Sequence, residues 1–395
     1  AHVDNVQLTT LGEYDLTLTA TSRAAAVGDA APGSALAAGP AARDAHVVVA
    51  TVHCRYVRRD VRGLSAADRD SFFGALQAMA RTPTRAGRAV WGADARSPAE
   101  LTGVHPQLAA GREDDHLHDG MGFITQHIAL TNEFEASVQA VAPAAAVPYW
   151  DYTYDEALLH WDARDQRYRH GDAHARPVDD IWRSALWRGD VFGNASGTSH
   201  TIETGRWAYM SVPRDRNATA KNAYGSLRAP WSSNKSPWST RGHRMCGESL
   251  QRSGGDAERW PSCASHYNLT FSAEYGSWYD YVWAAPYRPH GPVHLNIGGY
   301  GNCESAIESL RGLDGVDDYV LEEFKVGAFK YVKDAWRYKL VEAPKYCSDD
   351  TPQEACTMVC GFDPADEDAS AYAWNYLSVF LGDFVRGITN RTTQL

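Results

Sequence analysis

The chain has 395 residues, of which 44% are hydrophobic and 22% are charged, so it holds enough apolar material for a sizeable core. Its formal net charge is -11, and no basic block is present to neutralise phosphates, which argues against a nucleic-acid partner. No apolar run reaches the length of a membrane span. We therefore expect a globular protein of one or two domains, without a nucleic-acid partner and without a membrane span.

The N-terminal part differs in pattern from the rest. Residues 1–22 alternate apolar and polar side chains, which predicts one or two strands. Residues 23–45 are rich in Ala, Gly and Pro and are interpreted as a linker or long loop. A β-branched run at 47–52 leads into the main body. These features predict an N-terminal segment over 1–45 and one domain over 46–395.

Helical periodicity dominates the main body. A first helix is predicted after Ser65, a residue type that caps helix N-termini. A second covers about 121–141, where apolar residues recur at spacings of three and four. Two more are predicted near 317–340 and 368–388, whereas 160–285 is interpreted as mostly loop. The fold class expected is mainly α.

The cysteines favour an oxidising, secretory route. Six of the seven lie after residue 245 and could pair into three disulfides, which leaves Cys54 over or bonded to another chain. The sequence opens at Ala1 without a signal-peptide pattern, which we interpret as a processed, extracellular product. An intracellular protein with reduced thiols is the alternative. The disulfide candidates are Cys246, Cys263, Cys303, Cys347, Cys356 and Cys360.

Asn-x-Ser/Thr triplets point to the same compartment. Chance alone would place roughly two in a chain of this size, so the set is a moderate signal. A fifth triplet, at Asn234, is followed too closely by Pro237 to count for much. The candidate glycosylation sites are Asn194, Asn217, Asn268 and Asn390.

Four histidines lie in contexts that suit a metal. His127 sits in the apolar stripe of the second predicted helix, where a buried imidazole needs partners for both ring nitrogens. His118 precedes it by nine residues. His290 and His294 are four apart, so on a helix both would point toward one metal. Each taken singly could be an ordinary core or surface histidine, but together they favour a site for copper, zinc or iron.

Four segments, in this order, resemble the superfamily of tyrosinases, catechol oxidases and molluscan haemocyanins, the type 3 copper proteins. An Arg-rich segment precedes a helix, two histidines nine apart match the CuA pattern, a Pro-Tyr-Trp-Asp turn follows, and a His-x-x-x-His pair with Gly-Gly matches CuB. The segments are Val57 to Ser65, His118 to His127, Val147 to Thr153 and His290 to Gly299.

The resemblance implies a four-helix bundle core with long loops and a few short N-terminal strands, holding two copper ions by three histidines each. It implies dioxygen as a partner, with phenolic small molecules oxidised to quinones in the enzymes and oxygen simply carried in the haemocyanins. The copper ligands that it assigns are His105, His118, His127, His290 and His294.

The first CuA ligand has two candidates in this sequence. His105 lies well upstream of His118, as the first ligand of the family does, and we favour it. His116, two residues before His118, is the competitor. The thioether that joins a cysteine to a CuA histidine in many members cannot form, because no cysteine lies between 55 and 245.

The resemblance fails at the third CuB ligand, because no histidine follows His294. The Asp-Pro pair at Asp363 and the residues after it are similar to a displaced last-ligand segment, which puts Asn375 or Tyr376 in the ligand position. Neither is a normal ligand of such a copper. A histidine from 160–266 could complete CuB, the site could be weak or empty, or two histidines and water could suffice.

Two functions of different kinds follow. The first is a copper-dependent oxidation of mono- or diphenols to quinones, weakened by the missing histidine. The second is a catalytically degenerate, glycosylated extracellular structural protein with protein assembly partners. An oxygen carrier ranks third. A zinc hydrolase ranks low, because His290-Gly-Pro-Val-His294 lacks the general-base Glu of a His-Glu-x-x-His motif.

Overall fold

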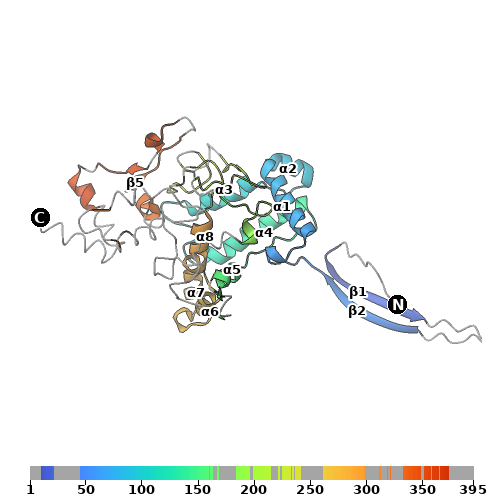
Figure 1. Cartoon of the computed structure of the whole chain (residues 1–395). Helices are drawn as coiled ribbons and strands as arrows, with labels where there is room; N and C mark the ends of the chain where they lie inside the picture. Colours follow the sequence, from blue (N-terminus) through green and yellow to red (C-terminus); the bar gives the residue numbers. More distant parts are fainter. Residues whose placement is uncertain are drawn as a thin grey trace, which may run out of the picture. The chain divides into compact units, whose positions relative to one another are not determined.

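The computed structural model shows a mainly α-helical chain with few strands, as the sequence predicts (Figure 1). Contacts divide the chain into two units, Ala1–Arg58 and Arg59–Leu395; the predicted boundary after residue 45 stays a prediction. None of the described helices combines the length and apolarity that crossing a bilayer requires. The residues that the structure describes are 10–21, 45–159, 161–162, 167–168, 184–195, 199–214, 221–222, 225–232, 234, 236–241, 261–298, 311–312, 318, 321, 332–347, 351–356, 358, 359–363 and 365–372.

A long β-hairpin makes up the described part of the first unit. Strand β1 (Gly12–Thr21) pairs antiparallel with β2 (Ala45–Cys54), with Gly12 opposite Cys54. Cross-strand partners share a face, so Leu18 and Val48 lie on one face and Glu13 lies on the other. The β-branched run that was expected to lead into the main body is therefore the second arm of the hairpin.

The helices predicted with the clearest signals are present. Helix α1 (Ala66–Arg81) begins at its predicted cap, where the Ser65 hydroxyl accepts a hydrogen bond from the Asp68 amide at 3.1 Å. Helix α4 (Gly122–Val141) matches the second predicted helix. The periodic stripe of α4 faces inward, and Val138 within it is fully buried.

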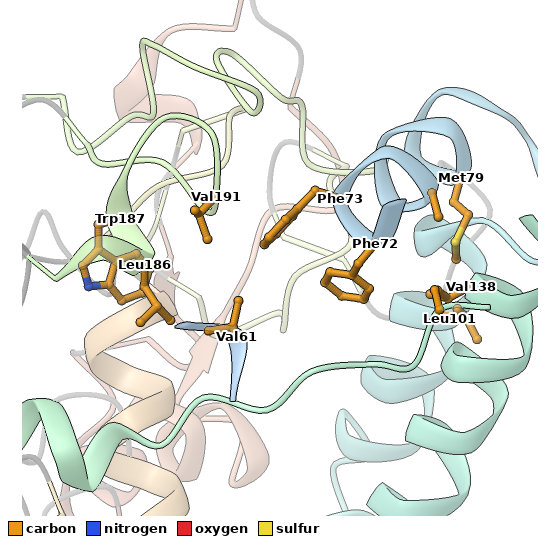
Figure 2. Close-up of a cluster of buried hydrophobic side chains, with 11 residues drawn as sticks. Val61, Phe72, Phe73, Met79, Leu101, Val138, Leu186, Trp187 and Val191 are labelled. Atoms are coloured by element: carbon orange, nitrogen blue, oxygen red, sulfur yellow. The ribbon is translucent and has the colours of Figure 1, made fainter. Parts of the chain in front are cut away.

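One apolar core joins the four helices of the expected bundle. Phe72 of α1, Leu101 of α3 (Pro98–Ala109) and Val138 of α4 converge in this core (Figure 2). Val293, on α8 (Gly291–Gly298), packs against the same cluster. The core thereby fixes the positions of α3, α4 and α8, which carry His105, His127 and His294.

Several short elements were not predicted. Two helices, α6 (Cys263–Phe271) and α7 (Trp278–Ala284), lie in the stretch interpreted as mostly loop. They are short and rich in aromatic residues, so no 3.6-residue period stands out. The remaining elements are η1 (Val61–Gly63), α2 (Thr84–Trp91), α5 (Tyr152–Leu159), β3 (Trp161–Asp162), β4 (Arg167–Tyr168), η3 (Ala185–Trp187), η4 (Ala273–Tyr275), η5 (Pro286–His290), β5 (Val341–Glu342), η6 (Gln353–Cys356) and β6 (Val359–Cys360).

The C-terminal helices are described in part. Residues 332–337 and 367–372 are helical, within the ranges predicted near 317–340 and 368–388 to within one residue. Most of the other residues of these two predicted helices lie outside the described residues, and so do Asn375 and Tyr376.

The cysteine prediction holds for one pair. Cys347 and Cys356 form a disulfide. Cys263 and Cys360 were predicted as disulfide candidates, but both are free thiols. Cys263 is the first residue of α6, and its thiol donates a hydrogen bond to the Thr153 hydroxyl at 3.3 Å. Cys360 lies in β6 opposite Val341. The two other candidates, Cys246 and Cys303, lie outside the described residues.

Candidate metal centre

Three histidines from separate places in the chain meet in the second unit. His105 lies on α3, His118 precedes α4, and His127 lies on α4. Their ligand atoms all lie within 4.8 Å of one another, and the ring centroids of His105 and His118 are 4.9 Å apart. Among the described residues, they are the only group of three or more potential metal ligands that meets in this way. We call these residues the three-histidine set.

Local sequence explains how the three rings come together. Ser97 caps α3 by accepting a hydrogen bond from the Glu100 amide at 3.3 Å, which fixes where the helix that carries His105 begins. Gly120 has a φ of 92°, a conformation that glycine adopts without steric cost. This residue lets the chain turn between His118 and the start of α4.

Each of two rings in the set uses one nitrogen to hold its orientation. The His118 Nδ1 lies 2.9 Å from the Asp115 carboxylate, and the His127 Nδ1 lies 2.8 Å from the Phe123 carbonyl. Both partners accept hydrogen bonds, so Nδ1 carries the proton and Nε2 keeps its lone pair. The His127 Nε2 is buried, and no described residue gives it a hydrogen-bond partner. A metal ion would satisfy this nitrogen, which is the ligand arrangement that metal-binding histidines have in proteins.

The pair formed by His290, the last residue of η5, and His294, on α8, lies against the three-histidine set. The His290 ring centroid is 5.6 Å from that of His118 and 5.6 Å from that of His127. It is also 5.3 Å from the ring of His294. The His290 Nδ1 lies 3.2 Å from the Pro286 carbonyl, which accepts a hydrogen bond from it. The proton is therefore on Nδ1 in this ring as well, and the Nε2 lone pair is left for a metal.

Phe123 packs against a ring of each histidine group. It is buried, with its ring centroid 4.5 Å from that of His127 and 5.0 Å from that of His290. Phe123 therefore shields both rings from water, while its carbonyl orients His127.

The electrostatics of the site favour neutral imidazoles. Burial, together with the charges of neighbouring histidines, lowers the pKa of His105 to about 3 and the pKa of His290 to about 3. Desolvation by neighbouring protein atoms, together with the charges of His118 and His127, also lowers the pKa of His294 to about 4. Neutral rings are the form that binds copper or zinc, so these side chains need not lose a proton at neutral pH.

The competing histidines lie elsewhere. The side chain of His116 is 59% exposed, and its Nε2 lies 3.3 Å from the Asp114 carboxylate, so the structure brings His105 rather than His116 to His118. The His266 Nε2 lies 2.8 Å from the Tyr152 hydroxyl. His200 lies in a loop, where its carbonyl accepts a hydrogen bond from the backbone of Arg241. The other histidines proposed to complete CuB, His160, His170, His174 and His243, lie outside the described residues.

Sequence reasoning missed the residues that orient the rings. Asp115 is three residues before His118, and its acidic side chain so close to a candidate ligand was a usable signal. The carbonyls of Phe123 and Pro286 lie four residues before their histidines, as expected within a helix, but a backbone group leaves no trace in the residue types. 

The predicted glycosylation sites are placed in part. Asn194 is exposed, and Asn268 is exposed on α6. Asn217 and Asn390 lie outside the described residues. The triplet that was discounted, at Asn234, has a buried side chain that donates to the Thr240 hydroxyl at 2.8 Å.

A helical core that brings histidines from two distant segments to one place, with Nδ1 tied and Nε2 left for a metal, defines a histidine-ligated metalloprotein. Residues 95–312, more than half of the chain, match the common central domain of tyrosinase. The chain therefore belongs to the tyrosinase family, whose members are copper proteins. No match was found among curated proteins. The orphaned His127 Nε2 and the all-imidazole donor set fit copper.

Proposed function

We propose that this chain is a secreted copper protein that oxidises mono- or diphenols with dioxygen. In this proposal, His105, His118 and His127 hold the first copper, and His290 and His294 contribute to the second. The observation that carries it is the convergence of the two histidine groups, with the His290 ring 5.6 Å from those of His118 and His127.

The residues of the chain have distinct tasks in this proposal. Copper, when bound, supplies the electron-transfer chemistry with dioxygen. Asp115 and the carbonyls of Phe123 and Pro286 keep three rings in the tautomer that presents Nε2. The Phe123 ring excludes water from one side of the site. The low pKa values of His105 and His290 keep these ligands free of protons at neutral pH.

Copper quantitation combined with oxygen uptake tests the proposal. The purified chain is loaded with copper, dialysed, and assayed for oxygen consumption with a catechol and with a simple monophenol. Stoichiometric copper and catechol-dependent oxygen uptake that a chelator abolishes are expected. Substoichiometric copper, or full copper without oxygen uptake, would overturn the enzymatic assignment.

A second candidate is a structural or assembly role on the same fold. It is favoured by the absence of any histidine after His294, which leaves CuB with two assigned histidines. Losing one of three ligands should weaken a metal site substantially, since even losses around the ligands cost about 10–100-fold in affinity. Full copper binding at the three-histidine set without oxygen uptake would favour this candidate over the enzyme.

Secretion belongs to the proposal as well. It is supported by the Cys347–Cys356 disulfide and by the exposure of Asn194 and Asn268. Expression in a secretory host followed by glycosidase treatment should lower the mass of the product. The variants Asn194→Gln and Asn268→Gln should each lose less mass on this treatment than the wild type, by the mass of one glycan. A mass that the glycosidase leaves unchanged in the wild type and in both variants would contradict glycosylation at these positions.

A further inference from the structure

The side chain of Asp115 is a fully buried carboxylate beside the copper site, with none of its surface exposed. It accepts hydrogen bonds from the backbone amides of Leu117 at 3.0 Å and His118 at 2.9 Å. It also contacts the His118 Nδ1 at 2.9 Å and the Lys333 ammonium at 2.6 Å. Burial alone would raise the pKa of Asp115, but the hydrogen bonds from His118 and Lys333 outweigh it and hold that pKa well below its usual range.

Lys333 reaches this carboxylate from far along the chain. It lies in helical residues 332–337, beyond the 95–312 that match the family domain. Its side chain is only 14% exposed, and its ammonium lies 5.5 Å from the centre of the Trp231 ring. A buried carboxylate without a countercharge is strongly destabilising, and among the described residues Lys333 is the lysine or arginine that pairs with Asp115.

We propose that Lys333 is a positioning residue for the copper centre, acting through Asp115 on His118. The ammonium fixes one carboxylate oxygen, and the carboxylate in turn fixes the ring plane and tautomer of His118. The Lys333 ammonium contacts Asp115 and the Trp231 ring and none of the described ligand rings, so it is not a catalytic residue. The inference rests on the proposed role of His118 as a copper ligand.

The same helix offers a matched control. Arg337 lies one turn after Lys333, and its guanidinium donates to the Asp119 carboxylate at 2.8 Å. Both ion pairs tie residues 332–337 to the segment 115–119, and the two basic side chains have similar exposure, at 14% and 17%. The difference is that the Asp115 carboxylate holds His118, whereas the Asp119 carboxylate makes no hydrogen bond with a histidine ring of the described residues.

The experiment compares Lys333→Met with Arg337→Met in the full chain, by copper competition against a chelator and by the EPR spectrum of bound Cu(II). Lys333→Met should weaken copper binding by about tenfold or more and alter the EPR hyperfine splitting, because an unfixed ring costs affinity on this scale. Arg337→Met should change affinity by less than about twofold, since it orients no ligand. Lys333→Arg keeps the charge and should recover part of the loss, although a guanidinium does not superimpose on an ammonium.

A second readout needs no copper. In the copper-free protein with 15N-labelled histidine, the His118 ring signals should shift or broaden in Lys333→Met and stay unchanged in Arg337→Met. If Lys333→Met does not fold, Lys333→Gln, which keeps a donor, takes its place. Equal affinity, EPR spectra and His118 signals in the two variants would overturn the inference. Failure of the wild-type chain to bind copper, with the His118 signals still perturbed, would reject the proposed function alone.

Discussion

The two histidine groups of the second unit differ in how the chain supports them. The three-histidine set draws His105, His118 and His127 from three separate places and includes a ring held by a fully buried carboxylate. The pair His290 and His294 comes from adjacent turns of one helical segment, with one ring tied to a backbone carbonyl. The first group can hold a metal by itself, because three imidazoles already make a complete set for many metals. The second needs a further ligand.

The largest effect is expected from His127→Gln, which keeps much of the side-chain volume while removing the buried Nε2. Copper affinity should fall by more than about 100-fold, beyond the range for losses around the ligands, because a first ligand is lost. Equilibrium dialysis against copper checks this. Retained copper would show that the three-histidine set is not the principal site.

His290→Gln should have a smaller effect on copper and a large one on oxidation. The three-histidine set stays complete, so the affinity of the tighter copper should drop by no more than about tenfold. Oxygen uptake with a catechol should be lost, because the second group no longer contributes a ligand at 5.6 Å from His118 and His127. If His290→Gln and His127→Gln lower copper affinity equally, the three-histidine set does not bind copper independently of the His290 and His294 pair.

Acid should destabilise the copper-free protein through the histidines of both groups. The pKa values of His105 and His290 are lowered from 6.5 to about 3, so the folded protein stays neutral there while the unfolded chain takes up protons below pH 6.5. The unfolded state binds more protons between about pH 6.5 and 3, so stability is lost as the pH falls through that window and is fully present above it. For one such histidine the loss between pH 7 and pH 5 is on the order of 2 kcal/mol. Denaturant midpoints at pH 7, 6 and 5 measure it, and His105→Gln should flatten the slope.

The smallest effect is expected from His116→Gln. This side chain is 59% exposed and its partner is the exposed Asp114, so its ion pair contributes little. Copper affinity should stay within about twofold of wild type, which makes this variant the control for His127→Gln in the same dialysis. A loss comparable to that of a ligand variant would show that His116, and not His105, completes the set.

Much of this fold could be predicted where local signals were strong. Ser65 and the 3.6-residue stripe of α4 gave the two main helices, because capping and amphipathic burial act over a few residues. The short aromatic helices α6 and α7 could not be predicted in this way. The strands of the hairpin were predicted from periodicity, but their pairing was not, because periodicity does not show which strands pair.

The site could be predicted through its side chains but not through its supports. Motif order pointed to the histidines and to the choice of His105 over His116, and the structure places those rings together. Lys333 is 218 residues from Asp115, and no local pattern links residues at that separation. The disulfide pairing could not be predicted either, because six cysteines allow about fifteen pairings and the sequence does not rank them.

The ion pairs from residues 332–337 also bear on where this domain can be cut. The family match ends at 312, yet Asp115 and Asp119 take their countercharges from Lys333 and Arg337. A fragment that stopped at 312 would keep every histidine of the set but would lose the ammonium that pairs with Asp115 and the guanidinium that pairs with Asp119. A truncation, domain swap or design based on this fold therefore needs its C-terminal boundary beyond Arg337.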